Sequence, residues 1–145
     1  MTVFRRIDHV GVVVDDLVHA GAVLRLLGFS LIRAQEVPER GVSIAFYGCG
    51  DGQIELIEPL RADIRGARLG SGAIARIEHI GVEVDSVHAV ADALQALGVA
   101  LTHADPVQIG PNLSNWTKIA TTAGIQFQLV ERRDPGSSET SEATF

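Results

Sequence analysis

A ten-residue segment occurs twice in this chain, with an offset of 70 positions. Residues 6–15 read RIDHVGVVVD, and residues 76–85 read RIEHIGVEVD. An ungapped alignment of residues 5–29 with residues 75–99 gives ten identities in 25 positions, more than shared strand propensity alone produces. The chain is therefore expected to contain two copies of one structural unit, and a residue that recurs in register is expected twice around a shared site.

Each copy predicts one strand, one helix and three further strands. A β-branched run predicts the first strand, Asp15-Asp16 predict a helix N-cap, and Gly28 ends the helix. The spacing of Leu17, Ala20, Leu24 and Leu27 predicts one apolar helix face. The expected strands are 7–14, 29–37, 42–48 and 53–58 around a helix at 17–27, then 77–84, 100–107, 115–121 and 125–131 around a helix at 87–97.

One βαβββ unit of this size cannot bury its own sheet, so the two copies are expected to pair about a pseudo-twofold axis. The predicted fold class is α+β, with two tandem βαβββ modules that form a curved mixed sheet around a metal-binding cleft. The modules are expected at residues 1–60 and 75–133, within one domain at 5–132. The connector at 61–74 lacks strand periodicity, and the polar tail at 134–145 is expected to be disordered.

Charge and composition exclude several functions. The net charge is −6 and Lys118 is the only lysine, which argues against nucleic acid or an anionic membrane as a general partner. The single cysteine rules out an intrachain disulfide. No apolar run reaches the roughly 20 residues that span a bilayer, and no apolar signal segment opens the chain. We expect a cytoplasmic protein that acts on a small molecule.

Four polar residues interrupt otherwise apolar strands. His9 and His79 recur in register, and the segments IELIE and FQLVE place Glu55 opposite Gln128 and Glu58 opposite Glu131 in a second alignment. The offset has grown from 70 to 73, which indicates a three-residue insertion in the second copy. Polar groups in the middle of half-buried strands are costly unless they are hydrogen-bonded or bound to a metal. Two imidazoles, a carboxylate and an amide oxygen form a ligand set that suits a divalent ion.

A simpler interpretation competes with the metal site. A lone histidine in a strand is more often a hydrogen-bonded structural residue, and a lone glutamate usually faces solvent. Recurrence in register favours the metal site over this alternative. The remaining histidines do not recur in register and are expected at the surface or at a strand edge; they are His19, His88 and His103.

The motifs resemble the vicinal oxygen chelate superfamily, which includes glyoxalase I, methylmalonyl-CoA epimerases, extradiol dioxygenases and antibiotic-resistance proteins. The resemblance covers residues 5–132 and rests on DHVGVVVDD, LLGF and IELIEP in the first half and on EHIGVEVD, ALGV and FQLVE in the second. Within the superfamily, VPERGVSIAFYGCGDGQIELIEPL at 37–60 is most similar to the epimerases, in which a PE-x-GV turn precedes a ligand strand.

The resemblance implies a mechanism and a set of site residues. It implies an isomerase in which a divalent ion (Co, Zn, Ni, Mn, Mg or Fe) is held by His9, Glu55, His79 and Gln128. The ion would polarise a thioester carbonyl while a carboxylate removes the α-proton, and Glu39 matches the glutamate that fills this role. The epimerase pattern has Gln in the first half and Glu in the second, whereas this chain has them exchanged. Because an amide cannot transfer a proton, Glu55, a water or a different reaction must replace the second acid/base.

Other functions remain open at this stage. A glyoxalase-type lyase, or an Fe(II) dioxygenase that uses His9, Glu55 and His79, would fit the same ligands. A resistance-type protein would bind a ligand without catalysis and usually without metal. The resemblance implies a substrate that is an acyl-CoA or a similar thioester, and it implies a homodimer. The connector arginines could contact CoA phosphates or be solvated, and Trp116 could anchor a lid or core or stack on substrate; the arginines are Arg61, Arg65 and Arg68.

Overall fold

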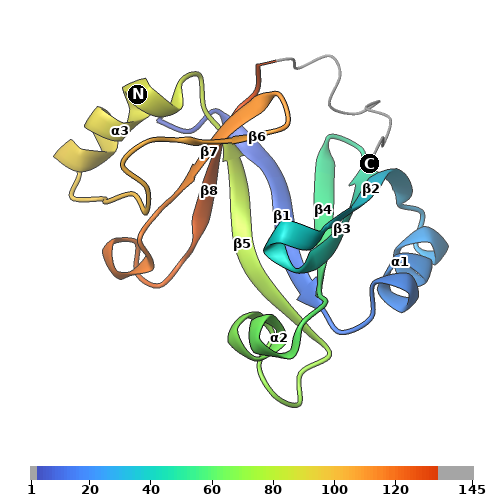
Figure 1. The fold of residues 1–145 in the computed structure, drawn as a ribbon. Helices are drawn as coiled ribbons and strands as arrows, with labels where there is room; N and C mark the ends of the chain where they lie inside the picture. Colours follow the sequence, from blue (N-terminus) through green and yellow to red (C-terminus); the bar gives the residue numbers. More distant parts are fainter. Residues whose placement is uncertain (1–2, 134–145) are drawn as a thin grey trace. The chain divides into compact units, whose positions relative to one another are not determined.

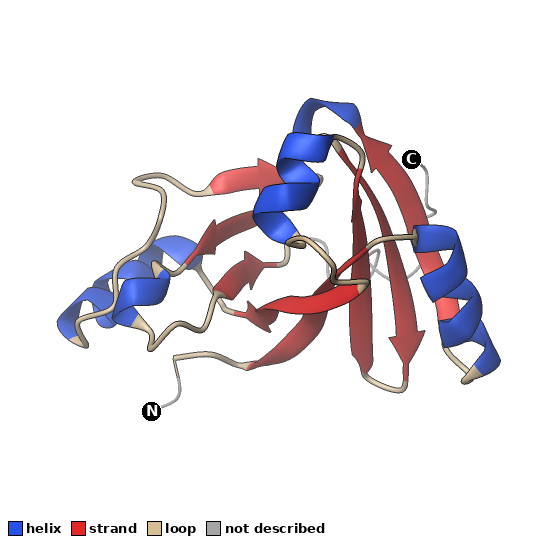
Figure 2. Cartoon of the chain, turned by 90° about the horizontal axis from the view of Figure 1, so that it is seen from below, coloured by secondary structure: helices blue, strands red, loops and turns tan. Residues whose placement is uncertain are grey.

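The computed structural model describes residues 3–133, and it contains the βαβββ order twice (Figure 1). Helices flank the strands in both copies, so the predicted α+β class is confirmed (Figure 2). The predicted tail at 134–145 lies outside the described residues. The first copy comprises β1 (Arg6–Val14), α1 (Leu17–Leu26), β2 (Ser30–Val37), β3 (Val42–Cys49) and β4 (Gly52–Pro59), and the second comprises β5 (Ala75–Glu83), α3 (Val87–Ala96), β6 (Val107–Ile109), β7 (Asn112–Trp116) and β8 (Phe127–Glu131).

The described residues divide into two compact units. The first unit contains residues 9–78, and the second contains residues 3–8 together with 79–133. The chain passes between the units inside β1, at the Asp8–His9 bond, and inside β5, at the Glu78–His79 bond. Each repeated histidine is therefore the first residue after a crossing.

In the first unit, the strands are ordered β2-β3-β4-β1, with β1 parallel to β4 and the other neighbours antiparallel. Helix α1 covers one face, where Leu17, Ala20 and Leu24 pack against a cluster that includes Tyr47. The expectation for Leu27 is wrong, because this residue is 69% exposed. The helix ends at Leu26, and Leu27 is its C-cap, where the chain turns away from the sheet.

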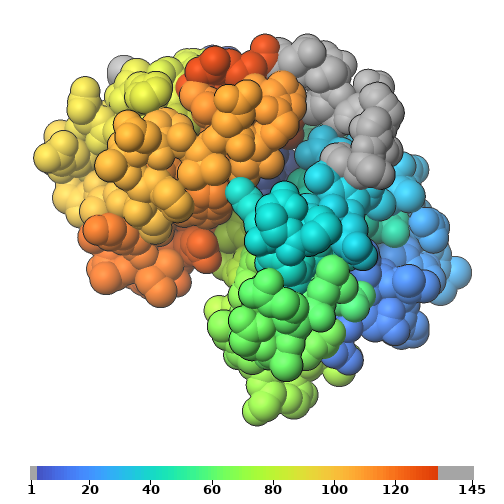
Figure 3. All heavy atoms as spheres, viewed as in Figure 1, coloured from blue at the N-terminus to red at the C-terminus, as the bar shows by residue number. Residues whose placement is uncertain are grey.

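A helix that the sequence did not predict covers part of the opposite face of this unit. Helix α2 (Ala62–Arg68) lies inside the connector, for which the sequence indicated only a lack of strand periodicity. Ile64 and the following Leu69 pack against Val13, Val42 and Ile57, which alternation puts on the same face as His9. The 3₁₀ turn η1 (Pro38–Arg40) lies beside α2 on the surface (Figure 3).

In the second unit, the strands are ordered β5-β8-β7-β6, and α3 packs on the face that carries Val82, Val84 and Leu129. Two predicted strands are misplaced. Residues 100–107 form only an isolated bridge at Leu101 before β6 begins at Val107, and the strand expected at 115–121 is β7 followed by the 3₁₀ turn η2 (Ile119–Thr121).

A buried amide explains why no strand forms near residue 103. The Asn115 side chain is 2% exposed, accepts a hydrogen bond from the His103 N–H and donates one to the His103 carbonyl. The backbone groups that a strand partner would use are therefore satisfied by a side chain. Pro106, which has no N–H to donate, then precedes β6.

A glutamate that recurs in the repeat accepts a backbone hydrogen bond at the start of α1 and another at the start of α3. Asp16 and Ser86 are the N-cap residues of α1 and α3, as the aspartate pair predicted for the first. In addition, Glu58 accepts a hydrogen bond of 2.8 Å from the Leu17 N–H, and Glu131 accepts one of 2.8 Å from the Val87 N–H. The predicted Glu58/Glu131 equivalence thus has a structural role at the helix N-termini. Across residues 3–133 we find no helix with the length and apolarity to span a membrane.

Candidate metal centre

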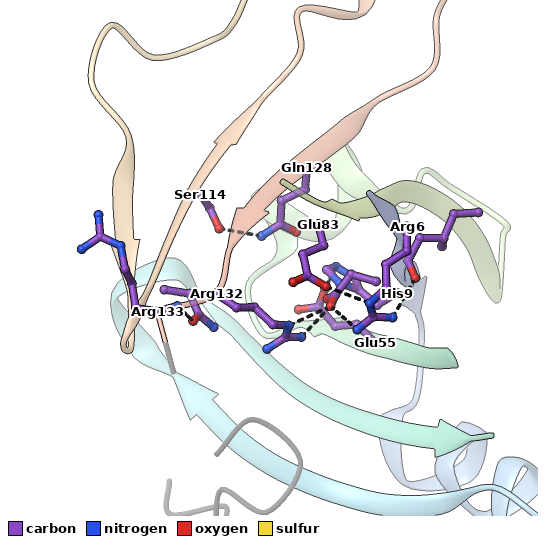
Figure 4. A network of polar contacts seen from close by, with 11 residues as sticks. Arg6, His9, Glu55, Glu83, Ser114, Gln128, Arg132 and Arg133 are labelled. Atoms are coloured by element: carbon purple, nitrogen blue, oxygen red, sulfur yellow. Dashed lines mark hydrogen bonds and ion pairs between the residues drawn. The ribbon is translucent and has the colours of Figure 1, made fainter. Parts of the chain in front are cut away.

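In the first unit, His9 and Glu55 form a close pair (Figure 4). Strand β4 pairs with β1 so that Glu55 lies opposite Gly11, and His9 shares a face with Gly11 two residues earlier. Glycine has no side chain, so the Glu55 carboxylate can reach toward His9. The His9 Nε2 and Glu55 Oε1 atoms are 3.5 Å apart, and their side chains are 4% and 13% exposed. The pair is therefore largely removed from water.

This separation fits two ligands of one ion. A distance of 3.5 Å is long for a charge-assisted hydrogen bond, which is typically about 2.7–2.9 Å. Two ligand atoms that each lie about 2.1 Å from one ion are separated by about 3.0 Å at a right angle and about 3.4 Å at the tetrahedral angle. The imidazole nitrogen and the carboxylate oxygen are also suitable donor types for a divalent ion. The residues of the first unit thus fit a His/Glu metal site.

The second unit repeats this register with an amide. Gln128 lies opposite Gly81, as Glu55 lies opposite Gly11, which confirms the predicted growth of the offset from 70 to 73. His79 is 5% exposed and precedes Gly81 by two residues. The Gln128 Nε2 donates to the Ser114 Oγ at 3.2 Å (Figure 4). Because this bond uses the amide nitrogen, the amide oxygen is the atom that can act as a ligand.

An aromatic residue lies beside each of these polar residues, and the sequence had singled out only one of the two, Trp116, without placing it next to Gln128. Phe46 lies opposite Glu55 on β3, and Trp116 lies opposite Gln128 on β7. The Phe46 ring also meets the His9 ring edge-on, with 5.7 Å between their centroids. An offset of 70 separates Phe46 from Trp116, so the repeat itself contained the signal.

The other predicted residues lie outside this pair. Glu39 is exposed on η1 and makes no hydrogen bond or ion pair with another residue of the described range 3–133. The connector arginines contact carboxylates of their own unit: Arg61 contacts Asp63, Arg65 contacts Asp15 and Arg68 contacts Glu78. His19, His88 and His103 are exposed, as expected.

An arginine binds the acid that precedes each histidine. The Arg132 Nε and Nη2 atoms donate to the Asp8 Oδ1 at 2.9 and 2.7 Å, and these side chains are 6% and 2% exposed. In the first unit, the Arg68 Nε and Nη2 atoms donate to the two Glu78 oxygens at 2.9 and 2.7 Å. The hydrogen bond to Glu78 raises the pKa of Arg68 above its usual value, although partial burial acts in the opposite direction. Both pairs anchor a strand one residue before a candidate ligand.

Replacing Arg132 by methionine is expected to lower the free energy of unfolding by about 3 kcal/mol, because the Asp8 carboxylate would stay buried after losing two short hydrogen bonds, whereas its contact with Arg6 is 3.5 Å long. Urea denaturation followed by circular dichroism measures this loss. As a control, Arg5→Met breaks the exposed Arg5–Asp85 pair and is expected to leave stability unchanged. The double variant Asp8→Asn/Arg132→Met should recover part of the loss, and equal losses in Arg132→Met and Arg5→Met would contradict the assignment.

The match to a family model defines the class of protein. The model of the glyoxalase/bleomycin resistance protein/dioxygenase superfamily matches residues 8–115, and the chain belongs to this superfamily. This result confirms the resemblance on which the sequence prediction rested.

Within the superfamily, the chain is similar to methylmalonyl-CoA epimerases. It is 32% identical over 108 residues to the ethylmalonyl-CoA/methylmalonyl-CoA epimerase of Cereibacter sphaeroides, covering 72% of this chain and 80% of the relative. It is 37% identical over 87 residues to the human mitochondrial methylmalonyl-CoA epimerase, covering 58% of this chain and 49% of the relative. The chain thus spans about half the length of the mammalian relatives it matches.

The fold is also similar to that of a solved epimerase. The crystal structure of methylmalonyl-CoA epimerase from Mycobacterium tuberculosis superposes with a TM-score of 0.82 and covers 95% of each chain. The two sequences are 22% identical, so this comparison supports the fold.

Proposed function

We propose that this protein is a metal-dependent epimerase that exchanges the proton α to the thioester carbonyl of a carboxylated acyl-CoA, such as methylmalonyl-CoA. The observation that carries this proposal is the repeated register in which a His-x-Gly segment faces Glu55 in one copy and Gln128 in the other. The similarity to methylmalonyl-CoA epimerases adds independent support for the reaction.

The proposed ligands of the divalent ion are the four residues expected from the repeat, His9, Glu55, His79 and Gln128. Two of them, His9 and Glu55, already have donor types and a separation that suit one ion. The metal, when bound, supplies positive charge that polarises the thioester carbonyl and acidifies the α-proton.

The carboxylates of this chain are proposed to move the proton. Glu39 takes the α-proton on one face of the substrate and later releases it to water, and Glu55, after taking a proton from water, gives that proton to the other face. Glu55 is the one carboxylate that the described strands of the first unit place on the face of His9. Gln128 orients the substrate or the metal. It takes no part in proton transfer, because a carboxamide is too weak an acid and too weak a base to exchange a proton at neutral pH.

A deuterium exchange experiment tests this function. The protein is dialysed against one divalent ion at a time and incubated with methylmalonyl-CoA in D₂O, and mass spectrometry follows the α-position. We expect one deuterium per molecule and loss of optical activity, both abolished by EDTA and restored by added metal. If metal is bound but no exchange occurs with any ion, the epimerase assignment is wrong. The metal's identity, a homodimer and a cytoplasmic location remain predictions from the sequence.

A further inference from the structure

We propose that Arg33 binds the carboxylate of the acyl-CoA substrate and so makes the site specific for carboxylated thioesters. This inference rests on the proposed function and deepens it by naming a specificity-determining residue. Four residues of the first unit lie side by side across neighbouring strands and form one row. Each is the register partner of the next: Arg33 on β2, Phe46 on β3, Glu55 on β4 and Gly11 on β1. Side chains in such a row lie on one face of the sheet.

The guanidinium of Arg33 extends along this row toward the candidate metal ligands. Its central carbon lies 4.2 Å from the centroid of the Phe46 ring, which places the positive charge over β3. Phe46 is the register partner of Glu55, so the ring that Arg33 covers belongs to the strand next to Glu55. Phe46 is 7% exposed and also contacts the ring of His9. The buried aromatic ring thus holds a cation beside the His9/Glu55 pair.

The chemistry of arginine suits the group that distinguishes the substrate. Guanidinium stays charged at all relevant pH values and presents five N–H donors in a plane that matches a carboxylate. When its face stacks on an aromatic ring, the donors at its edge remain oriented in that plane, and they can serve more than one acceptor. Methylmalonyl-CoA carries a carboxylate on the α-carbon, whereas propionyl-CoA has none. A cation next to the ligand pair would favour the former.

In the equivalent row of the second unit, an imidazole takes the place of the guanidinium. Trp116 takes the place of Phe46 opposite Gln128, and the group that stacks on it is the exposed imidazole of His103, with 5.4 Å between the ring centroids. An imidazole offers at most two N–H donors, whereas a guanidinium offers five and stays charged, so the imidazole binds a carboxylate less strongly. The repeat therefore carries an aromatic residue in both rows but a fixed positive charge only in the first, which assigns the carboxylate to the first row.

Calorimetric titration of metal-free protein with methylmalonyl-CoA and with propionyl-CoA tests the inference without relying on turnover. In the wild type, we expect a lower Kd for the carboxylated thioester. Arg33→Met should raise the Kd for methylmalonyl-CoA at least tenfold and leave that for propionyl-CoA unchanged, and Arg33→Lys should keep part of the preference. Thermal unfolding of each variant checks that the fold is retained.

Arg25 offers a matched control. Its guanidinium stacks on Tyr47 at 5.7 Å, and Tyr47 follows Phe46 on β3 and therefore lies on the opposite face. Arg25→Met removes a similar arginine–aromatic contact and the same charge, but it should leave both Kd values unchanged. Equal weakening of the two ligands by Arg33→Met, or equal effects of Arg33→Met and Arg25→Met, would overturn the proposal.

The outcome for Arg33 can be separated from that for the proposed function. If the wild type prefers methylmalonyl-CoA and Arg33→Met removes this preference, the carboxylate assignment stands even when deuterium exchange fails. If exchange occurs but Arg33→Met keeps the full preference, the epimerase function stands and the role of Arg33 is wrong.

Discussion

Alanine at position 9 is expected to abolish stoichiometric binding of a divalent ion and, with it, the exchange of the substrate's α-proton. His9 is 3% exposed and lies 3.5 Å from Glu55, so its loss removes one of the proposed ligands from a site that is largely closed to water. Loss of residues that only support metal ligands already lowers metal affinity about 10–100-fold. Removal of a direct ligand should therefore lower it by more than about 100-fold. Elemental analysis after dialysis against Co²⁺ or Zn²⁺ measures this loss.

Two further histidine variants make the test specific. His79→Ala should give the same loss, because His79 occupies the equivalent position in the second copy. His88→Ala should keep the metal, since His88 is exposed on α3. His9→Phe keeps the volume of a ring but has no ligand atom, and it replaces the alanine variant if circular dichroism shows that alanine unfolds the protein. Full metal content in folded His9→Phe and His79→Ala proteins would contradict the site.

The repeat made the ligand strands predictable. Ten identities align β1 with β5, and the shift of the offset to 73 pairs Glu55 with Gln128 from the sequence alone. The alternation of side chains along β1 and β5 is kept in the structure because one face of each strand packs against a helix, and this packing fixes the register. The parts that follow the repeat closely were therefore read correctly from one sequence.

The parts that depend on contacts distant in sequence were not predictable. Helix α2 has little apolar periodicity, and it is held by Leu69 in a cluster with Val13 and by the Arg68–Glu78 pair. The Asp8–Arg132 pair joins residues 124 positions apart. The misplaced strands of the second copy follow from the buried Asn115, whose amide bonds the backbone of His103. No pattern within a short window reports these partners, because tertiary contacts determine them.

The exchange of Glu and Gln between the halves affects catalysis more than metal binding. Coordination tolerates the exchange, because Glu55 and Gln128 occupy equivalent register positions. The exchange changes how protons can be moved, because both proposed acid/base residues, Glu39 and Glu55, then belong to the first copy. The role of Glu39 therefore decides whether this chain uses two carboxylates for epimerisation.

Replacing Glu39 by glutamine is expected to keep the bound metal and to slow α-proton removal by about 10²–10⁴-fold, the usual contribution of a general base. Glu39 is exposed on the η1 turn, so the substitution should not disturb folding. The two enantiomers of methylmalonyl-CoA are tested separately in D₂O. Because Glu39 serves one face, exchange from one enantiomer should nearly stop while exchange from the other continues through Glu55.

Glu36→Gln provides the matched control for this experiment. Glu36 is an exposed glutamate on β2, three residues before Glu39, and it lies opposite Ser43 on the sheet face away from Arg33 and Phe46. Its substitution should leave both exchange rates unchanged. If Glu39→Gln slows both enantiomers equally, Glu39 affects binding and does not act as the base. If it slows neither, Glu39 is a solvated turn residue, and proton removal must be assigned to Glu55 or to a water.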